Sequence, residues 1–354
     1  MISEIEEERG HYTMTLNVKG VTYDVGTPTI GGGLTRDTLA ADVVAREMHI
    51  IAKELHCTAV RITGQDIHRL KMAAELAARN GLEIWISPSL HDASEQETFH
   101  QMIEVACVCE ELRKQEAQVV LVLGCELSVF MSGLIPGENG LERLAVLSDP
   151  SRWTEELFAK GSPVERLNSF LAGMAMEARR HFSGPLTYAA GLWEDIDWRI
   201  FDFVGIDAYR DAHNLNHFRD MIRQYQVHGK PVFVTEFGCC TYAGAQEQGG
   251  MGWLVIDRHS TPWRLNKPLV RDEDAQARYL MELLALFADE EVHGAFVFTF
   301  VSPSYPSHVD PHYDLDIASY SLVRSWNTVE TARSPLPWEP KKSFHVIAQY
   351  YGHH

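Results

Sequence analysis

The sequence has few positive charges for its length. It contains 31 Lys and Arg against 49 Asp and Glu, which gives a formal net charge of -18. Basic surfaces bind phosphate backbones and anionic lipid headgroups, so this balance argues against nucleic acid and against a membrane surface as partners. It favours a protein that acts on a neutral or cationic small molecule.

Cysteine is also scarce, and its positions form no paired framework. No CxxC motif is present, and the six cysteines are Cys57, Cys107, Cys109, Cys125, Cys239 and Cys240. Structural zinc sites and the disulfide frameworks of secreted domains need more regular spacings than these. We therefore expect free thiols in a reducing compartment.

The sequence shows neither a secretion signal nor a membrane span. Its N-terminus is acidic, where a signal would be basic and then apolar. No apolar run approaches the roughly 20 residues that cross a bilayer. Residues 1–15 are predicted to be a polar lead-in, and the protein is predicted to be cytoplasmic.

Fingerprints of cofactor binding are missing as well. The glycine run 31–33 has neither the GxxxxGK[ST] nor the GxGxxG spacing, and it does not open directly into a helix. His308, Asp310, His312 and Asp314 alternate potential metal ligands, but no second cluster completes a site. The sequence therefore predicts no organic cofactor and no metal.

What the sequence does contain is a regular alternation of apolar strands and amphipathic helices. Hydrophobic residues make up 45% of the chain, and strands are predicted at 21–25, 58–63, 82–87, 119–123, 185–190, 201–207, 231–235 and 294–300. Alternation of this kind indicates βαβ units and a parallel sheet. We predict one (β/α)8 barrel domain over residues 1–354, with long loops at 130–162 and 242–271 and a closing helix and tail at 341–354. An open doubly wound sheet is the alternative.

Two of the predicted strands end on a glutamate. Glu126 follows the fourth strand and Glu236 follows the seventh. Barrel enzymes carry their chemistry at the carboxyl ends of the strands, so these two side chains should face each other across one pocket. Two carboxylates placed in this way can act as general acid/base and nucleophile on a glycosidic bond. The alternative is that each Glu only caps a loop or pairs with a nearby Arg.

These residues resemble the large clan of retaining (β/α)8 glycoside hydrolases. The segment Thr235-Glu-Phe-Gly is the most specific part of the likeness, which spans nearly the whole chain in strand order. The resemblance implies that Glu126 is the acid/base and Glu236 the nucleophile. It also implies that Arg61 and Tyr209 support the nucleophile, and that an aromatic residue of 298–300, Phe300 in our assignment, stacks on the sugar.

The sequence departs from this clan at one position. The clan has Asn immediately before the acid/base, where it binds the sugar 2-hydroxyl, and this chain has Cys125, a weak donor. The overall sequence, with the segment 314–321, also looks like a poorly characterised bacterial barrel group labelled abortive-infection proteins. This departure favours either an unusual sugar as substrate or a barrel that no longer catalyses hydrolysis.

Further residues at predicted strand ends are candidates for binding substrate. His91, Asp92 and Asp207 could bind hydroxyl groups, and loop packing is the alternative for each. Aromatic side chains in strand-end loops could stack on sugar rings, or could only anchor those loops; they are Trp193, Trp253, Trp263, Tyr242 and Tyr305.

Three functions follow from these residues, and the sequence does not indicate an oligomeric state. The first is a retaining glycosidase acting on a small-molecule or oligosaccharide substrate. The second is a non-catalytic or repurposed barrel that binds a carbohydrate-like ligand, in defence or in partner binding. The third is a lyase or isomerase that uses the same two glutamates for proton abstraction, and the missing phosphate and metal motifs argue against it.

Overall fold

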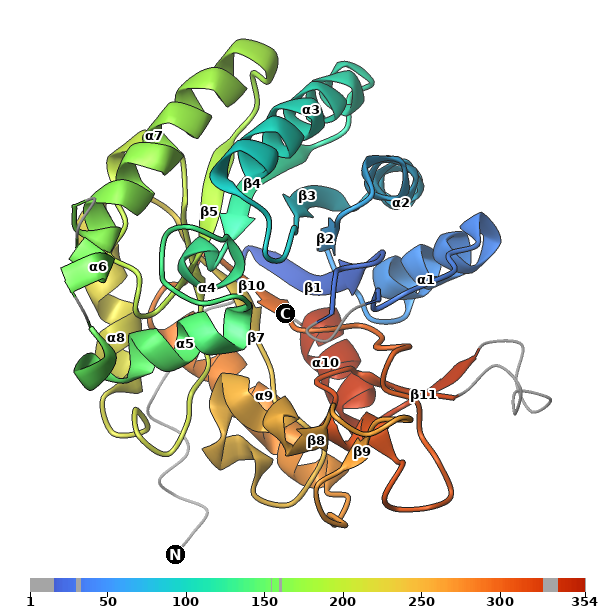
Figure 1. Ribbon diagram of the computed structural model, residues 1–354. Coiled ribbons are helices and arrows are strands. Elements are labelled where there is room, and N and C mark those ends of the chain that lie inside the picture. The colour runs from blue at the N-terminus through green and yellow to red at the C-terminus, as the bar shows by residue number, and fades with distance from the viewer. Residues whose placement is uncertain (1–15, 30–32, 154, 159–160, 327–336, 354) are drawn as a thin grey trace, which may run out of the picture.

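Eight parallel strands close into a barrel at the centre of the molecule (Figure 1). The computed structural model describes residues 16–29, 33–153, 155–158, 161–326 and 337–353, so the predicted lead-in at 1–15 lies outside the described residues. Neighbouring strands follow the order β1-β10-β7-β6-β5-β4-β3-β2. Their bounds are β1 (Val18–Asp24), β2 (Ala59–Gly64), β3 (Glu83–Pro88), β4 (Val119–Cys125), β5 (Leu186–Gly191), β6 (Val204–Asp207), β7 (Val232–Phe237) and β10 (Gly294–Val297). The predicted (β/α)8 barrel is confirmed.

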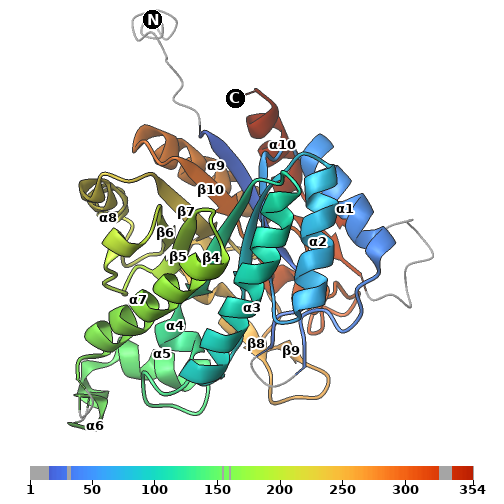
Figure 2. The same cartoon turned by 90° about the horizontal axis from the view of Figure 1, so that it is seen from above.

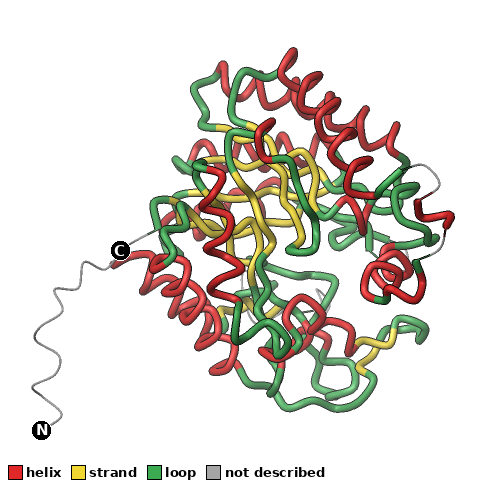
Figure 3. Tube along the Cα trace, turned by 90° about the vertical axis from the view of Figure 1, so that its left-hand side faces the viewer, coloured by secondary structure: helices red, strands yellow, loops and turns green. Residues whose placement is uncertain are grey.

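Helices surround the barrel on its outer side (Figures 1 and 3). The longer ones are α1 (Ala41–Lys53), α2 (Ile67–Arg79), α3 (Glu95–Lys114), α7 (Pro163–His181), α9 (Glu273–Asp289) and α10 (Lys342–His353). Shorter segments, η2 (Trp198–Ile200), α8 (Phe218–Arg223) and η3 (Gln224–His228), flank β6. Because all barrel strands are parallel, their carboxyl ends form one rim.

Polar side chains at the first turns explain where several of these helices begin. Asp66 and Asp272 each accept a hydrogen bond from a backbone N–H in the first turn of α2 and α9. Ser94 and Glu97 form a reciprocal capping box at the start of α3. Such caps satisfy N–H groups that have no partner inside the helix.

Aromatic side chains fill the barrel near the amino ends of its strands. Trp85 is fully buried, with ring centroids 4.6 Å from Phe233 and 4.9 Å from Phe296. A side chain at Gly20 would collide with the ring of Phe296, so glycine leaves the space that this ring occupies. This packed layer is typical of a barrel core. Because this aromatic layer fills the barrel near the amino ends of the strands, space for a cavity remains at their carboxyl ends.

Two long connections at the carboxyl rim hold more structure than the sequence predicts. Residues 130–162 contain α5 (Gly140–Ser148), η1 (Pro150–Arg152) and α6 (Glu155–Phe158), directly after α4 (Leu127–Phe130). Residues 242–271 contain η4 (Ala245–Glu247), η5 (Gly249–Val255) and a hairpin of β8 (Ile256–Asp257) and β9 (Arg264–Leu265). Figure 2 shows α4, α5 and this hairpin at the same end of the barrel. Most of these elements are too short for apolar periodicity to reveal.

A buried cluster of ion pairs holds the connection after β10 to the C-terminal segment. Asp316, in η6 (Leu315–Ala318), lies 2.8 Å from Arg271 and 3.1 Å from Lys341. Asp316 and Lys341 are fully buried, and removing one partner of a buried pair costs about 3–5 kcal/mol. Strands β11 (Val323–Ser325) and β12 (Trp338–Pro340) pair with each other, and both lie between Asp316 and Lys341 in the sequence. Segment 314–321 therefore has a structural role in this chain.

The cysteines are free thiols, and four of them are buried. Burial raises the pKa of Cys109 and of Cys57, and it raises the pKa of Cys239 to about 12. These thiols are therefore protonated at neutral pH and pack as small apolar groups. Among the helices that the structure describes, none is both long and apolar enough to cross a membrane.

Candidate active site

A cavity of about 650 Å³ opens at the carboxyl ends of the barrel strands. Small-molecule sites have volumes of roughly 300–1,000 Å³, so this cavity can hold a ligand of a few sugar rings. Glu126 and Glu236 both line it. The two glutamates singled out in the sequence therefore share one cavity, as their strand positions predict.

Both carboxylate oxygens of Glu236 accept hydrogen bonds from residues that the resemblance pointed to. Arg61 Nη1 donates to Oε1 at 2.5 Å, and the Tyr209 hydroxyl donates to Oε2 at 3.0 Å. Glu236 lies within β7, in register with Asp207 of β6, so the hydrogen bonds of the sheet hold its backbone. The carboxylate is thereby held in one orientation over the cavity.

Arg61 is anchored across three strands. It lies in β2 and is almost fully buried. Its Nη1 also donates to the Thr235 carbonyl at 3.2 Å, and its Nη2 donates to Ser87 Oγ at 3.0 Å. A buried guanidinium is costly unless an opposite charge and hydrogen bonds compensate it, and Glu236 supplies that charge. Arg61 therefore fixes the position of Glu236 and balances its charge.

Glu126 lies in a different electrostatic environment. Its backbone is left-handed, with φ 45° and ψ 46°, at the turn from β4 into α4. Non-glycine residues adopt this conformation rarely, and such positions are common at functional sites. Burial raises the pKa of Glu126 well above that of an ordinary glutamate, and the carboxylates of Asp207 and Glu236 raise it further. Glu126 is therefore suited to carry a proton near neutral pH.

Glu194 fixes the chain that follows Glu126. Its Oε1 accepts the backbone N–H of Ser128 at 3.0 Å and a hydrogen bond from the Tyr188 hydroxyl at 3.1 Å. The same hydroxyl accepts the N–H of Leu127 at 2.7 Å. These bonds satisfy the first turn of α4, a helix too short to be stable alone. The placement of Glu126 thus depends on β5 and the loop after it.

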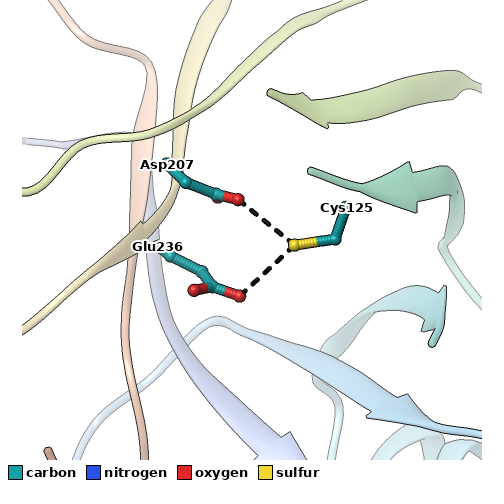
Figure 4. Close-up of side chains that lie close together, drawn as sticks. All are labelled: Cys125, Asp207 and Glu236. Atoms are coloured by element: carbon teal, nitrogen blue, oxygen red, sulfur yellow. Dashed lines mark hydrogen bonds between the residues drawn. The ribbon is translucent and has the colours of Figure 1, made fainter. Parts of the chain in front are cut away.

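Cys125 and Asp207 bring a thiol and a third carboxyl group to the same place (Figure 4). Cys125 Sγ lies 3.2 Å from Asp207 Oδ2 and 3.7 Å from Glu236 Oε1. Thr235 Oγ1 donates to Asp207 Oδ1 at 2.7 Å. Burial and the charge of Glu236 raise the pKa of Asp207 to about 8. Burial also raises the pKa of Cys125, so its thiol stays protonated and is a poor nucleophile.

Among the described residues, the group of side chains that could hold a metal ion consists of Cys125, Asp207 and Glu236. Ligand atoms of Cys125, Asp207 and Glu236 all lie within 4.8 Å of one another. However, Glu236 Oε1 already accepts a hydrogen bond from Arg61 at 2.5 Å. A cation bound to that oxygen would be repelled by the guanidinium. The arrangement therefore fits protons shared among acidic groups better than a divalent cation.

Aromatic side chains form part of the cavity wall. Trp193 is 47% exposed, and its indole N–H donates to Ser128 Oγ at 3.0 Å, which orients the ring. His91 stacks on Phe130 with ring centroids 4.3 Å apart, and burial lowers the pKa of His91 to about 4. Within the described structure, Nδ1 of this neutral imidazole has no hydrogen-bond partner. Phe298, at the end of β10, also lines the cavity.

Comparisons with known proteins show the same fold in carbohydrate-active enzymes. No family model and no curated protein sequence matches the chain. A solved structure of a GH113 β-1,4-mannanase matches it with a TM-score of 0.61 and 13% identity, over 96% of this chain and 99% of the mannanase. The GH113 β-mannanase of Alicyclobacillus acidocaldarius matches with a TM-score of 0.58 and 14% identity, over 96% and 99%. This chain has the fold of these glycosidases.

The β-glucuronidase of Parabacteroides merdae carries a similar barrel within a longer chain. It matches with a TM-score of 0.58 and 13% identity, over 95% of this chain and 36% of the glucuronidase. The resemblance to (β/α)8 glycoside hydrolases is confirmed for the fold. In this glycosidase-type barrel the predicted residues Arg61, Glu126, Tyr209 and Glu236 all line one cavity.

Four residues predicted as candidates for substrate binding do not line that cavity: Asp92, Tyr242, Trp263 and Phe300. Asp92 instead pairs with the buried Arg143, and the Tyr242 hydroxyl donates to a backbone carbonyl at 3.0 Å. Phe300 is fully buried against Tyr23. The predicted eighth strand extended to residue 300, but β10 ends at Val297. The side-chain alternation of the strand therefore stops before Phe300, and Phe298 is the ring that reaches the cavity.

The structure also adds residues that the sequence reasoning missed. Asp24, at the end of β1, lines the cavity, and burial raises the pKa of its carboxyl group. It ends a strand on an acidic side chain just as Glu126 does, so the same rule could have found it. Leu144 and Leu147 of α5 also line the cavity. Because their helix was expected to be a loop, no sequence signal pointed to them.

Proposed function

We propose that the protein is a retaining O-glycoside hydrolase with Glu236 as nucleophile and Glu126 as acid/base. The observation that carries the proposal is the contrast between two carboxyl groups in one cavity. Glu236 accepts hydrogen bonds from Arg61 and Tyr209, whereas the pKa of Glu126 is raised by burial and by nearby negative charge. Paired carboxyl groups in unlike environments are the usual mark of acid and base roles.

In the first step Glu236 attacks the anomeric carbon of the bound glycoside. A carboxylate oxygen forms the new bond to carbon while the bond to the leaving oxygen breaks. Glu126 gives its proton to that oxygen, so the departing group leaves as a neutral alcohol. Arg61 and Tyr209 keep the attacking carboxylate aligned, which lowers the entropy cost of reaching the transition state.

In the second step Glu126, now ionised, takes a proton from water, and the water oxygen displaces Glu236 from the anomeric carbon. The ester formed on Glu236 carries no charge in the intermediate. One source of the raised pKa of Glu126 is therefore absent at the moment when it must act as a base. The same residue can thus serve as acid in one step and base in the next.

The cavity supports a carbohydrate as the ligand. Trp193 and Phe298 offer aromatic surface for sugar rings, and the neutral His91 offers a nitrogen for a hydroxyl group. The structural neighbours include β-1,4-mannanases and β-glucuronidases. We therefore infer a β-linked glycoside or oligosaccharide as the substrate class, and the mechanism requires no metal or organic cofactor.

Covalent trapping tests the proposal directly. The protein is incubated with fluoro-sugars and cyclophellitol-type epoxides of gluco, manno and galacto configuration, and intact mass and peptide mapping locate the label. We expect one label on Glu236 and none in Glu236→Gln. A label on another residue, or none with any configuration, contradicts the proposal.

Azide gives an independent assignment of the two roles. In Glu126→Ala, azide can attack the glycosyl-enzyme on the face that water uses, so the glycosyl azide retains the substrate configuration. In Glu236→Ala, azide enters the space of the lost carboxylate and gives the inverted product. NMR of the anomeric proton distinguishes the products, and the opposite pattern would exchange the roles.

A second candidate is a barrel that binds a carbohydrate-like ligand without cleaving it. Cys125 favours this reading because it stands where the glycosidase clan has an Asn ligand for the 2-hydroxyl, and its thiol lies against Asp207 instead. Sugar binding without trapping and without turnover would support this candidate.

A further inference from the structure

Arg258 lies in a box of three aromatic rings at the cavity wall. Its guanidinium carbon is 4.3 Å from the ring centroid of Trp253, 5.4 Å from that of Trp263 and 5.9 Å from that of Tyr305. Arg258, Trp253 and Tyr305 all line the cavity that contains the two glutamates. Arg258 directly follows β8, in the hairpin that Figure 2 shows at the carboxyl end of the barrel. The box thus places a positive charge in the cavity wall.

No carboxylate of the described residues pairs with this charge. The Tyr305 hydroxyl accepts one N–H at 2.5 Å, and Nε is buried with no acceptor in the described structure. Ring contacts offset part of the cost of desolvating a guanidinium, but they leave its N–H donors without acceptors. Arg264, on β9 of the same hairpin, differs because it lies 3.4 Å from Asp257. An unpaired guanidinium at a cavity wall is suited to bind an anion.

The other charged side chains that line the cavity are mostly acidic, so the positive charge of Arg258 differs from its surroundings. Acidic side chains line it at Asp24, Glu126, Asp207, Asp211 and Glu236. Arg61 is the other arginine in the described lining, and it is paired with Glu236 at 2.5 Å. Because those carboxyl groups that are ionised repel an anion, an anionic ligand needs a local cation. Arg258 provides it.

Packed residues connect the box to Glu236. Trp253 follows Gly252, whose N–H donates to the Tyr320 hydroxyl at 2.9 Å. Tyr320 packs edge-on against Tyr209 with ring centroids 5.8 Å apart, and Tyr209 donates to Glu236. The box and Glu236 therefore belong to one continuous wall of the cavity.

We propose that Arg258 and its aromatic box form a subsite for an anionic group of the substrate, which is then an acidic glycoside carrying a carboxylate, phosphate or sulfate. The proposal rests on the glycosidase function proposed above and narrows its substrate class. It differs from the expectation, drawn from net charge, of a neutral or cationic ligand. A guanidinium in contact with the ligand outweighs distant surface charges, which salt screens beyond about 8–10 Å.

The kinetic test compares matched substrates and matched variants. Methylumbelliferyl β-glycosides of gluco, manno and galacto configuration are assayed beside their uronides, 6-phosphates and 6-sulfates, with wild type, Arg258→Met, Arg258→Lys and the control Arg264→Met. We expect wild type to prefer one acidic series. Arg258→Met should lower kcat/KM for that series by about 10- to 150-fold, the range for a lost charged hydrogen bond. It should change the neutral series little, Arg258→Lys should fall between, and Arg264→Met should match wild type.

A structural role for Arg258 predicts a different result. If the arginine only holds the hairpin in place, Arg258→Met should lower kcat/KM equally for neutral and acidic glycosides, which would overturn the proposal. Efficient hydrolysis of neutral glycosides without preference for an acidic one would also overturn it, while the glycosidase function would stand.

A binding measurement separates the failure of the subsite from the failure of catalysis. Saturation-transfer NMR of the intact protein is recorded with glucuronate, glucose 6-phosphate, glucose 6-sulfate and glucose. Binding of one anionic sugar that glucose does not share and that Arg258→Met abolishes supports the subsite, even if no glycoside is cleaved; in that case the hydrolase proposal fails alone. No selective binding to wild type, together with no acidic preference in the kinetics, refutes the subsite.

Discussion

Replacing Glu126 by Gln should abolish proton donation while preserving the shape of the site. The change removes the proton but keeps the size of the side chain. It also removes a carboxyl group whose ionised form is destabilised most by burial, and then by the negative charges of Asp207, Glu236 and Glu194 in that order. The variant should therefore fold, and its melting temperature near pH 8 should be at least that of the wild type.

The expected magnitude depends on the leaving group. General acid catalysis contributes about 10²- to 10⁴-fold, or about 2.7–5.4 kcal/mol of transition-state stabilisation. A methyl or sugar leaving group should lose that full factor in kcat/KM. A 2,4-dinitrophenolate leaves without a proton, so its kcat/KM should fall less than about 10-fold. For the dinitrophenyl glycoside, both kcat and KM of Glu126→Gln should fall, because the variant lacks the base that releases the glycosyl-enzyme.

The assay compares these leaving groups across pH with wild type, Glu126→Gln and the control Glu138→Gln, an exposed carboxylate on the loop after α4. Because the pKa of Glu126 is raised, the wild-type kcat/KM should stay high to pH values above the ordinary range of a glutamate and then decline. The variant should lose that alkaline limb, and Glu138→Gln should match wild type. Equal losses for good and poor leaving groups would refute Glu126 as the proton donor.

Three further changes probe the rest of the cavity. Tyr209→Phe removes the 3.0 Å hydrogen bond to Glu236, a charged hydrogen bond worth about 1.5–3 kcal/mol, so kcat/KM should fall about 10- to 150-fold with little change in melting temperature. Burial raises the pKa of Asp207 in the folded protein to about 8 from its ordinary value of 3.8, so its contribution to stability is full below pH 4 and lost as pH rises toward 8. The melting temperature of the wild type should decline over that window, and Asp207→Asn should flatten the decline; a parallel decline in both proteins would contradict the assignment. Trp193→Ala removes a ring that is 47% exposed, so KM for oligosaccharides should rise several-fold with kcat preserved, and an unchanged KM would exclude stacking on this ring.

The barrel itself could be predicted because its signals are local. The strands are covered on both faces, so segments such as Val119–Cys125 read as continuous apolar runs. Helix starts are marked by side chains that cap their own first turn, as Ser94 does for α3. Once the order of strands is known, the rim on which Glu126 and Glu236 lie follows from the parallel arrangement.

The parts that could not be predicted depend on contacts between distant segments. The short helix α5 and the hairpin β8–β9 are too brief to show a clear period in the sequence. Tyr242 stands in a loop where aromatic residues were expected to face the ligand, but its hydroxyl bonds to Gly252 instead. Which way a loop side chain points is decided by its partners, and these lie elsewhere in the chain.

By itself, the sequence determined the closed barrel, the end of it that carries the polar groups, and two glutamates that line one cavity. The tertiary structure alone decided the charge states within the cavity. The pKa of Glu126 is raised because burial and other carboxyl groups surround it, while Glu236 lies against Arg61. The aromatic contacts of Arg258, on which the anionic subsite rests, are likewise visible only in the tertiary structure. Electrostatic free energies depend on distance and burial, and neither can be read from the order of residues.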